Sequence, residues 1–335
     1  MRTSTHKLIS LGLLVVALGV GALVLLGAAR RGSSIESMDF DRVQRSTSPA
    51  YDARLTRPSE AGVKAFRIPI KDATIDIASG VTYHAWTFGG TVPGPVLRVR
   101  VGDDVRITVV NESPMPHSID FHAARIPANF AYRTIMPHDS VAFTFTARDA
   151  GAFMVHCGTP PVLMHIMQGM YLPIIVDPRD GWPTAADKEF VLVQSEFYTK
   201  GQDADWPAAM AKNASYVVFN GRAFQYRDNP LQVEVGDRVR LFVVNAGPNA
   251  TSDFHIVGAV FDRIYPDGDP SHALSGVQTY AVPPGGGAVF ETVFDRDASG
   301  EGQYPFVTHS FADAEKGAVG MIQVGMPTMY AHLSH

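Results

Sequence analysis

One short run of the sequence offers a thiol, imidazoles and thioethers that can meet at a single point. It begins with His156-Cys157, has a second histidine at His165 and ends at Met170, and Cys157 is the only cysteine of the chain. Two imidazoles, one thiolate and a weak axial methionine make up a blue-copper electron-transfer site. We expect the other imidazole to come from His117. The alternative is a buried thiol without a metal, which the spacing of these residues disfavours.

Two copies of one pattern must position these residues. Residues 97–111 and 231–245 both alternate apolar and polar side chains, break at Gly-Asp and continue in a more hydrophobic stretch that ends at Asn. Short strands, Pro/Gly turns and almost no helical periodicity indicate an antiparallel sandwich in each copy. The sequence therefore predicts an all-β fold, with domain 1 over residues 61–180 and domain 2 over residues 188–327.

The N-terminal region has a different character. Residues 8–29 carry no charge, and 22 residues at about 1.5 Å each would cross a bilayer core. We expect residues 1–30 to form a membrane anchor, although Gly27-Ala28-Ala29 also fits a signal-peptide cleavage site. Residues 31–60 read as a linker and residues 328–335 as a tail. Either form of the N-terminus predicts a periplasmic or other extracytoplasmic protein.

Composition narrows the possible functions. A length of 335 residues suits about two domains, and 46% hydrophobic with 18% charged residues is a globular composition. The net charge of -5 argues against nucleic acid as the main partner. A single cysteine excludes an intrachain disulfide, so an exported body must be stable by packing alone.

The two copies differ at the positions of the first metal site. Thr251 stands where the first copy has His117, Ser310 stands where it has Cys157, and Met170 has no counterpart. A repeat that keeps its framework but loses these residues is expected to bind one electron-transfer copper, in domain 1 only.

Three histidines remain at matching turns or strand ends, namely His122, His156 and His309. Successive side chains of a strand point to opposite faces, so His156 is expected to face away from Cys157 and to serve a different metal. Three neutral imidazoles with an open fourth position suit a metal that binds water or a substrate. The alternative is that each is an ordinary hydrogen-bonded or exposed histidine.

Two groups close to this second set are able to handle protons. Asp120 lies two residues before His122, on the same side of an extended strand, and His255 is the equivalent of His122 in the second copy. A carboxylate and an imidazole beside an open metal site suit general acid–base chemistry on a bound oxyanion. The alternative makes Asp120 a turn-capping residue and His255 a core histidine.

At this point the chain resembles a known family, the copper-containing nitrite reductases, which are two-domain members of the multicopper oxidase superfamily. The resemblance covers about residues 65–326. The motifs that carry it are Pro93-Gly94-Pro95, Met115-Pro116-His117-Ser-Ile-Asp120-Phe-His122, His156-Cys157 through Met170, Phe254-His255-Ile-Val-Gly258 and His309-Ser-Phe-Ala-Asp-Ala-Glu-Lys-Gly317. Together they are far more specific than any one of them alone.

The resemblance implies cupredoxin-like Greek-key domains and two coppers per chain. The implied ligands of a type 1 copper are His117, Cys157, His165 and Met170. Those of a type 2 copper are His122, His156 and His309, with Asp120 and His255 as the catalytic pair and Val257 in the substrate pocket. The resemblance also implies a homotrimer in which a neighbouring chain supplies His309.

One departure from the family lies in the loop of the type 1 site. Seven residues separate Cys157 from His165, one fewer than in many members, which puts the colour and potential of this copper and the donor-docking surface in question. Met164 and Met167 flank the site and compete with Met170 as the axial ligand, but Met170 has the family spacing.

The resulting hypothesis is reduction of nitrite to nitric oxide, with one electron passing from an external donor through Cys157 and His156 and with two protons from Asp120 and His255. A small cytochrome c or cupredoxin is the expected donor. One alternative is a two-domain laccase-like oxidase, which the absence of any His-X-His pair disfavours. The other is a membrane-tethered copper electron carrier without catalysis.

Overall fold

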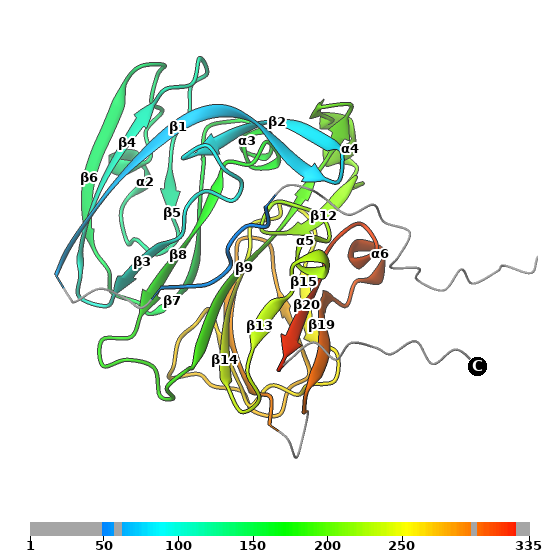
Figure 1. Ribbon diagram of the computed structural model, residues 1–335. Helices are drawn as coiled ribbons and strands as arrows, with labels where there is room; N and C mark the ends of the chain where they lie inside the picture. The colour runs from blue at the N-terminus through cyan, green and yellow to red at the C-terminus, as the bar shows by residue number, and fades with distance from the viewer. Residues whose placement is uncertain (1–48, 57–61, 296–299, 326–335) are drawn as a thin grey trace, which may run out of the picture. The chain divides into compact units, whose positions relative to one another are not determined.

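The computed structural model describes residues 49–56, 62–295 and 300–325. The expected membrane segment, most of the linker and the C-terminal tail lie outside these residues. No helix in the described part of the chain is long and apolar enough to cross a membrane. Figure 1 shows two β-sandwiches that follow each other along the chain.

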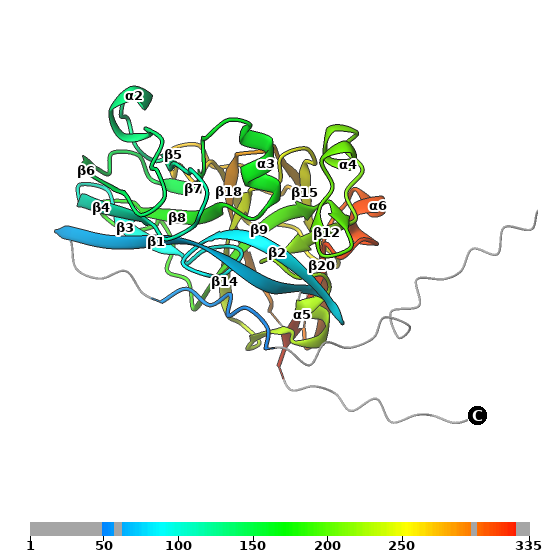
Figure 2. The same ribbon diagram turned by 90° about the horizontal axis from the view of Figure 1, so that it is seen from above.

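The first sandwich pairs a sheet of order β2-β1-β4-β6 with a sheet of order β3-β8-β7-β5. Its strands are β1 (Val63–Ala78), β2 (Val81–Phe88), β3 (Leu97–Arg100), β4 (Asp104–Asn111), β5 (Asp120–Phe121), β6 (Ser140–Thr146), β7 (Gly151–His156) and β8 (Tyr171–Asp177). In β4 and β6 every second residue is buried, because one face of this sheet meets the core and the other meets solvent. The long β1 extends along this sandwich toward the second one in both ribbon views (Figures 1 and 2).

The second sandwich pairs sheets of order β12-β9-β14-β18-β16 and β13-β20-β19-β15-β17, beside a small β10-β11 hairpin. Its strands are β9 (Lys188–Phe197), β10 (Thr199–Lys200), β11 (Asp203–Ala204), β12 (Tyr216–Phe219), β13 (Leu231–Val233), β14 (Arg238–Asn245), β15 (Ser252–Ile256), β16 (Arg263–Pro266), β17 (Thr279–Val282), β18 (Gly287–Val293), β19 (Gly302–Thr308) and β20 (Val319–Val324).

The described helices are all short. They are α2 (Ala128–Ala131), α3 (Val162–Met167), α4 (Trp206–Met210), α5 (Gln225–Asp228) and α6 (Phe311–Ala314). The expected all-β fold is therefore confirmed. The expected strand–turn–strand units are present as β3-β4 and β13-β14, each turning at a glycine with positive φ, Gly102 at 100° and Gly236 at 93°.

The expectation of an antiparallel sandwich in each copy was wrong in part, because most strand pairs of the described residues are antiparallel but four are parallel. β1 pairs with β4 and β3 with β8 in parallel, and the second domain repeats this with β9–β14 and β13–β20. Between the two members of such a pair the chain crosses to the opposite sheet and returns in the same direction. Alternating side chains report which face is buried and carry no information on the direction of the neighbouring strand.

A third apolar layer joins the two sandwiches. Beyond the core of each domain, a cluster combines residues of β7 and β8, such as Met154 and Ile175, with residues of β9, β14 and β18, such as Val193 and Phe242. All seven residues of β8 are buried, because both faces of this strand are covered. At one contact an added Cβ on Gly287 would lie 1.9 Å from the carbonyl oxygen of Ala152, so only glycine fits there.

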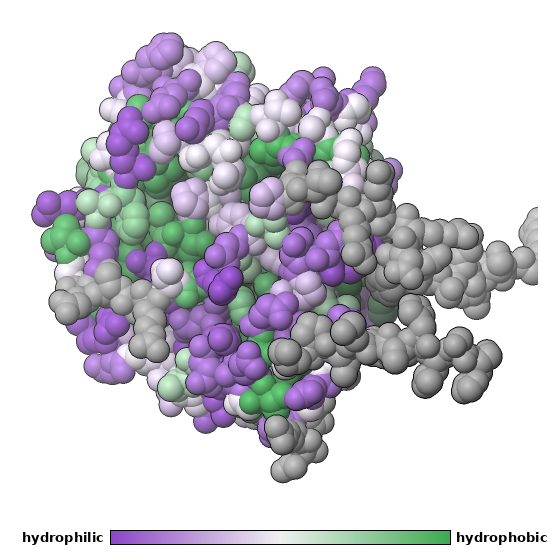
Figure 3. All heavy atoms as spheres, in the orientation of Figure 1, coloured by the Kyte–Doolittle hydropathy of each residue, from purple (hydrophilic) through white to green (hydrophobic). Residues whose placement is uncertain are grey.

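Part of the expected linker also packs on the second domain. Ala53 is buried, and its carbonyl oxygen accepts from the amide of Val191 at 2.8 Å. The amide of Leu55 donates to the carbonyl oxygen of Glu189 at 2.9 Å. On the face shown in Figure 3, hydrophilic residues are interspersed with apolar patches.

Candidate functional site

A buried cluster in the first domain brings together His117, Cys157 and His165. The two Nδ1 atoms lie 3.1 Å apart, and Sγ of Cys157 lies 3.3 Å from Nδ1 of His165. His117 and Cys157 have no solvent exposure, and His165 has 5%. Two imidazole nitrogens and one sulfur thus converge on one point that is shielded from water.

Three separate elements deliver these side chains. Cys157 follows the last residue of β7, and His165 lies in the last turn of α3. His117 sits on a loop that pairs with Ile135 through two backbone hydrogen bonds of 3.1 and 2.6 Å. The side chain of Asn111 at the end of β4 holds this loop, because its Nδ2 donates to the carbonyl oxygens of Met115 and Ile135.

The electrostatics of the cluster keep its imidazoles neutral. Burial, with His165 as a second cause, lowers the pKa of His117 to about 4, and burial lowers the pKa of His165 to about 4. Nε2 of His117 lies 3.2 Å from the hydroxyl of Ser113, which favours the tautomer with its lone pair on Nδ1. Neutral rings with inward lone pairs are ready to bind a metal ion.

Packing distinguishes the three methionines that compete for the axial position. Met170 is fully buried and belongs to the same hydrophobic cluster as Cys157, whose amide donates to the Met170 carbonyl at 3.1 Å. Met167 belongs to the core cluster of the second domain, and Met164 packs against that cluster. The surroundings therefore favour Met170, and its role as a ligand stays a prediction.

A second, more exposed cluster holds Asp120, His122 and His156. The Nε2 atoms of the two histidines lie 3.0 Å apart, and Oδ2 of Asp120 lies 4.0 Å from Nε2 of His156. Nδ1 of His156 donates to the carbonyl oxygen of Cys157 at 2.9 Å, and Nδ1 of His122 to that of Gly285 at 3.1 Å. Both rings therefore carry their lone pair on Nε2, toward each other.

The pKa of His122 is lowered, first by burial and then by His156. Asp120 and the hydrogen bond to Gly285 oppose this shift. Since β5 and β7 are antiparallel and Asp120 pairs with His156, the carboxylate and the imidazole are held on the same face of the sheet. The second cluster thus combines two imidazoles with an adjacent carboxylate.

His255 and His309 form a separate pair in the second domain. Their ring centroids lie 5.4 Å apart, and Nδ1 of His255 donates to the carbonyl oxygen of Gln278 at 2.7 Å. Val257, next to His255 in sequence, is 46% exposed. Among the described residues His309 is not part of the group formed by His122 and His156. The three histidines of the expected type 2 site are therefore not assembled within one chain.

Comparison with known proteins identifies the family to which this chain belongs. A family model described as multicopper oxidase matches residues 69–181. A copper-containing nitrite reductase of Neisseria meningitidis serogroup B is 41% identical over 289 residues, covering 83% of this chain and 72% of the relative. This chain belongs to the copper-containing nitrite reductases.

Solved structures of the same family share its cupredoxin-like fold. The copper nitrite reductase of Nitrosomonas europaea has a TM-score of 0.72 at 39% identity, covering 79% of this chain and 95% of that one. The copper-containing nitrite reductase of Thermus scotoductus has a TM-score of 0.73 at 33% identity, covering 79% of this chain and 62% of that one.

The residues present fit the copper ions of this nitrite reductase family. In the buried cluster a thiol and two neutral imidazoles supply the soft and intermediate donors that copper prefers. In the exposed cluster two Nε2 lone pairs face each other, and donation from the opposite ring nitrogens to carbonyl groups fixes their direction. The cofactor assignment made from the sequence is thus supported by the donor chemistry of both sites.

Three residues around the buried cluster were missed by the sequence analysis. The amide of Ser118 donates to Sγ of Cys157 at 3.3 Å, and Ser113 contacts His117. The half-buried indole of Trp86 lies over both imidazoles, with centroid distances of 5.4 Å to His117 and 5.0 Å to His165. The sequence repeat could have revealed one other supporting residue, Asn111. Asn111 and its counterpart Asn245 each donate from the side chain to a carbonyl oxygen of the loop that follows.

Proposed function

We propose that this protein reduces nitrite to nitric oxide and water, using one electron from an external donor and two protons. The observation that carries the proposal is the junction between the two clusters. Cys157 of the buried cluster and His156 of the exposed cluster are consecutive residues. The backbone thereby links a buried site, suited to electron transfer, directly to a more exposed site, suited to binding a small anion.

Copper bound at the two sites would supply one-electron exchange at the first and an exchangeable, Lewis-acidic position at the second. Asp120, whose side chain is 35% exposed, faces that second position and would hold a proton against an oxygen of nitrite. His255 keeps Nε2 free for proton exchange because its Nδ1 is bound to the carbonyl oxygen of Gln278. The exposed Val257 side chain would narrow the pocket beside it.

The test is direct measurement of nitric oxide from the purified, copper-loaded protein with nitrite and a reduced dye. We expect Asp120→Asn and His255→Ala to keep both coppers and to lose turnover by about 10²–10⁴-fold. Asp104→Asn, on the exposed side of β4, is the matched control and should keep full activity. Full activity of either site variant would refute the proton assignment.

The same preparation separates the two alternatives. Oxygen consumption with about four coppers per chain would favour the oxidase. A type 1 signal alone in electron paramagnetic resonance, without nitric oxide, would favour an electron carrier. About two coppers per chain and a type 2 signal that shifts on addition of nitrite are expected for the reductase.

We also propose that a neighbouring copy of the chain completes the second site by supplying His309, in a homotrimer. The separation of His309 from His122 and His156 within one chain supports this. Light scattering should give a mass of about three times 36.3 kDa. A monomeric protein with full activity would contradict the proposal.

We further propose that residues 1–30 anchor the protein to the cytoplasmic membrane, with the sandwiches on the extracytoplasmic side. The uncharged run of residues 8–29 supports this. Cell fractionation and mass spectrometry of the N-terminus would separate an anchor from a cleaved signal.

A small cytochrome c or cupredoxin is the proposed electron donor. The reduced form of this donor should be oxidised continuously by the protein only when nitrite is present.

A further inference from the structure

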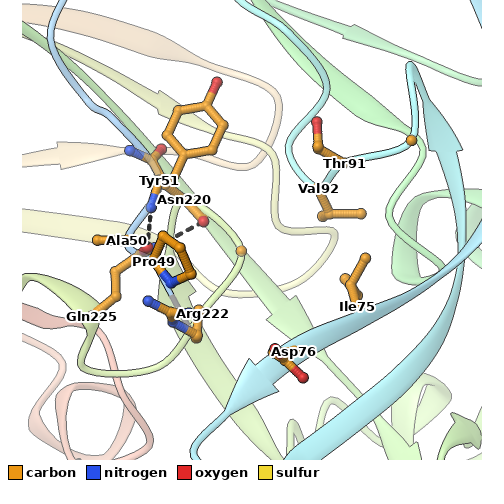
Figure 4. Close-up of a pocket in the computed structure, with 12 residues that line it drawn as sticks. Pro49, Ala50, Tyr51, Ile75, Asp76, Thr91, Val92, Asn220, Arg222 and Gln225 are labelled. Atoms are coloured by element: carbon orange, nitrogen blue, oxygen red, sulfur yellow. Dashed lines mark hydrogen bonds between the residues drawn. The ribbon is translucent and has the colours of Figure 1, made fainter. Parts of the chain in front are cut away.

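A cavity of about 300 Å³ opens where the two sandwiches and the segment before β1 meet (Figure 4). Its walls come from Tyr51, from Ile75 and Asp76 near the end of β1, from Val92, and from the turn after β12 that carries Arg222. Its volume is at the small end of the range found for ligand sites. None of its lining residues belongs to the two clusters described above.

Arg222 is the unusual group in this wall. The residue is only 6% exposed, yet its Nε and Nη2 atoms have no hydrogen-bond partner in the described part of the chain. A buried guanidinium donor without a partner is costly, and such groups in native proteins call for an explanation, an unseen ion or ligand among them. The neighbouring cavity gives room for one.

The two unpaired atoms form the edge of the guanidinium that grips a carboxylate. Arg98 uses this edge on Asp177, with Nε donating to Oδ2 at 2.7 Å and Nη2 to Oδ1 at 2.9 Å. Arg125 uses it on Asp149, with distances of 2.8 and 2.6 Å. This planar fork matches a carboxylate in a bidentate way. Nε and Nη2 of Arg222 thus have the geometry to donate to both oxygens of a carboxylate, but no carboxylate of the described residues bonds to them.

The turn that carries Arg222 is held firmly. An added Cβ on Gly221 would lie 1.8 Å from the carbonyl oxygen of Val92, so the turn is in close contact with the first domain. The amide of Ala223 donates to the carbonyl oxygen of Ile77 at 2.8 Å. Nε2 of Gln225 donates to the carbonyl oxygen of Asn220 at 2.8 Å. A preorganised turn lowers the entropic cost of binding a ligand.

The charges around the cavity restrict the ligand further. Burial lowers the pKa of Arg222, while Asp76 and Asp228 oppose this shift, and a guanidinium stays protonated in proteins. Asp228 is already paired with Arg227 at 3.0 Å. Asp76 therefore leaves the cavity with little net positive charge, which disfavours a dianion such as phosphate relative to a monoanion.

We propose that this cavity binds a small organic monocarboxylate. Its carboxylate would take the Nε and Nη2 edge of Arg222, and its apolar body would lie against Ile75, Val92 and the ring of Tyr51. Both nitrogens are buried from solvent, so binding of the carboxylate would require the guanidinium to rotate toward the cavity. The site is separate from the nitrite chemistry, and its occupation would bridge the two sandwiches.

The test is isothermal titration of the full-length, copper-loaded protein with butyrate and with benzoate. We expect saturable binding to the wild type and an affinity about 10- to 100-fold lower for Arg222→Met, since a bidentate charged contact is lost. Arg125→Met, which removes an exposed arginine that uses the same edge, is the matched control and should bind as the wild type does. Asp76→Asn should bind tighter and should also accept inorganic phosphate.

Two further measurements keep the outcome decisive. Arg222→Met should melt at an equal or higher temperature without ligand, because a buried unpaired charge is removed. Ile75→Phe leaves Arg222 in place but fills the cavity, and it should also lose binding. Equal affinity in wild type and Arg222→Met, or no binding of either carboxylate at concentrations on the order of 10 mM, would overturn the proposal. Rates of nitric oxide formation should be the same in wild type and Arg222→Met.

Discussion

Nδ1 of His156 donates to the carbonyl oxygen of Cys157 across 2.9 Å. This contact fixes the ring so that Nε2 faces Nε2 of His122, while Sγ of Cys157 lies in the buried cluster with His165. Two consecutive residues therefore place one side chain in each cluster. We expect a substitution at either residue to affect the other site as well, so the effects should be assayed at both.

Ser118 supports the sulfur of Cys157. Its amide donates to Sγ at 3.3 Å, and its hydroxyl lies 3.8 Å from Sγ and accepts from the amide of Gly158 at 2.9 Å. Ser118→Ala should lower the free energy of unfolding by about 1 kcal/mol. It should also lower the reduction potential of the copper-loaded protein, because hydrogen bonds around the cysteine sulfur tune that potential. Redox titration and urea unfolding measure the two effects, with the exposed Ser140→Ala as control.

Trp86 packs over both imidazoles of the buried cluster. Trp86→Leu removes two aromatic contacts and should lower the free energy of unfolding by about 1–2 kcal/mol, and Trp86→Phe should recover part of the loss. Because the rings lose their support, the visible absorption of the copper-loaded Leu variant should shift or broaden. An unchanged spectrum in the Leu variant would show that the ligands are held without the indole.

Mixed assemblies can test the sharing of the second site. His122→Ala and His309→Ala are each expected to abolish turnover. When the two variants are unfolded and refolded together, the proposed trimer would bring an intact His122 from one chain to an intact His309 from another. We expect part of the wild-type rate to return in the mixture. Nitrite reduction by the mixture at the level of the separate variants would place His309 outside the site.

Glu196 gives the second domain a pH-dependent stability. Its carboxylate is buried and accepts from the hydroxyl of Tyr198 and the amide of Ala250. Burial raises the pKa of Glu196 above its usual value, and these hydrogen bonds offset only part of the shift. The folded state thus binds this proton more tightly than the unfolded state. The contribution of Glu196 to the free energy of unfolding is most favourable below the unfolded pKa of about 4.3. This contribution is lost as pH rises through the folded pKa.

Glu196→Gln removes this titration while keeping an oxygen for the amide of Ala250. The free energy of unfolding of Glu196→Gln should therefore fall less than that of the wild type as pH rises from about 4 to 8. Urea unfolding across this pH range measures the free energy of unfolding of both proteins, with the exposed Glu234→Gln as control. Parallel profiles for wild type and Glu196→Gln would assign the pH dependence to other groups.

The buried cluster was within reach of sequence analysis because three of its expected ligands, Cys157, His165 and Met170, belong to one local run. Strand alternation was sufficient to separate His156 from Cys157, since the period of a strand is a local property. The repeat then excluded a second copy of this cluster in domain 2. Local spacing and duplication together therefore predicted which residues gather at each site, while their roles as ligands stay predictions.

Other features depend on contacts between distant segments. Trp86 contacts His117 and His165 although it is 31 or more residues away from each in the sequence, and nothing in the sequence around it indicates these contacts. The parallel pairing of β1 with β4 is likewise set by how the chain crosses between sheets. Nε and Nη2 of Arg222 are unpaired because no acceptor of the described residues lies within hydrogen-bonding distance of them. Such features require the three-dimensional arrangement.

A buried ion network should make the junction between the sandwiches sensitive to one carboxylate. Glu189 at the start of β9 accepts from Nη1 of Arg98 at 2.8 Å and from Nη1 of Arg240 at 2.6 Å, and both guanidinium groups are nearly buried. Asp177 and Glu291 hold the other edges of these arginines. Glu189→Leu should therefore lower the free energy of unfolding by about 2–3 kcal/mol, because each arginine loses one of its two carboxylates in a largely buried place. Glu189→Gln keeps one acceptor oxygen and should lose less. Urea unfolding of both variants measures this, and a Leu variant as stable as the wild type would mean that Asp177 and Glu291 alone neutralise the junction.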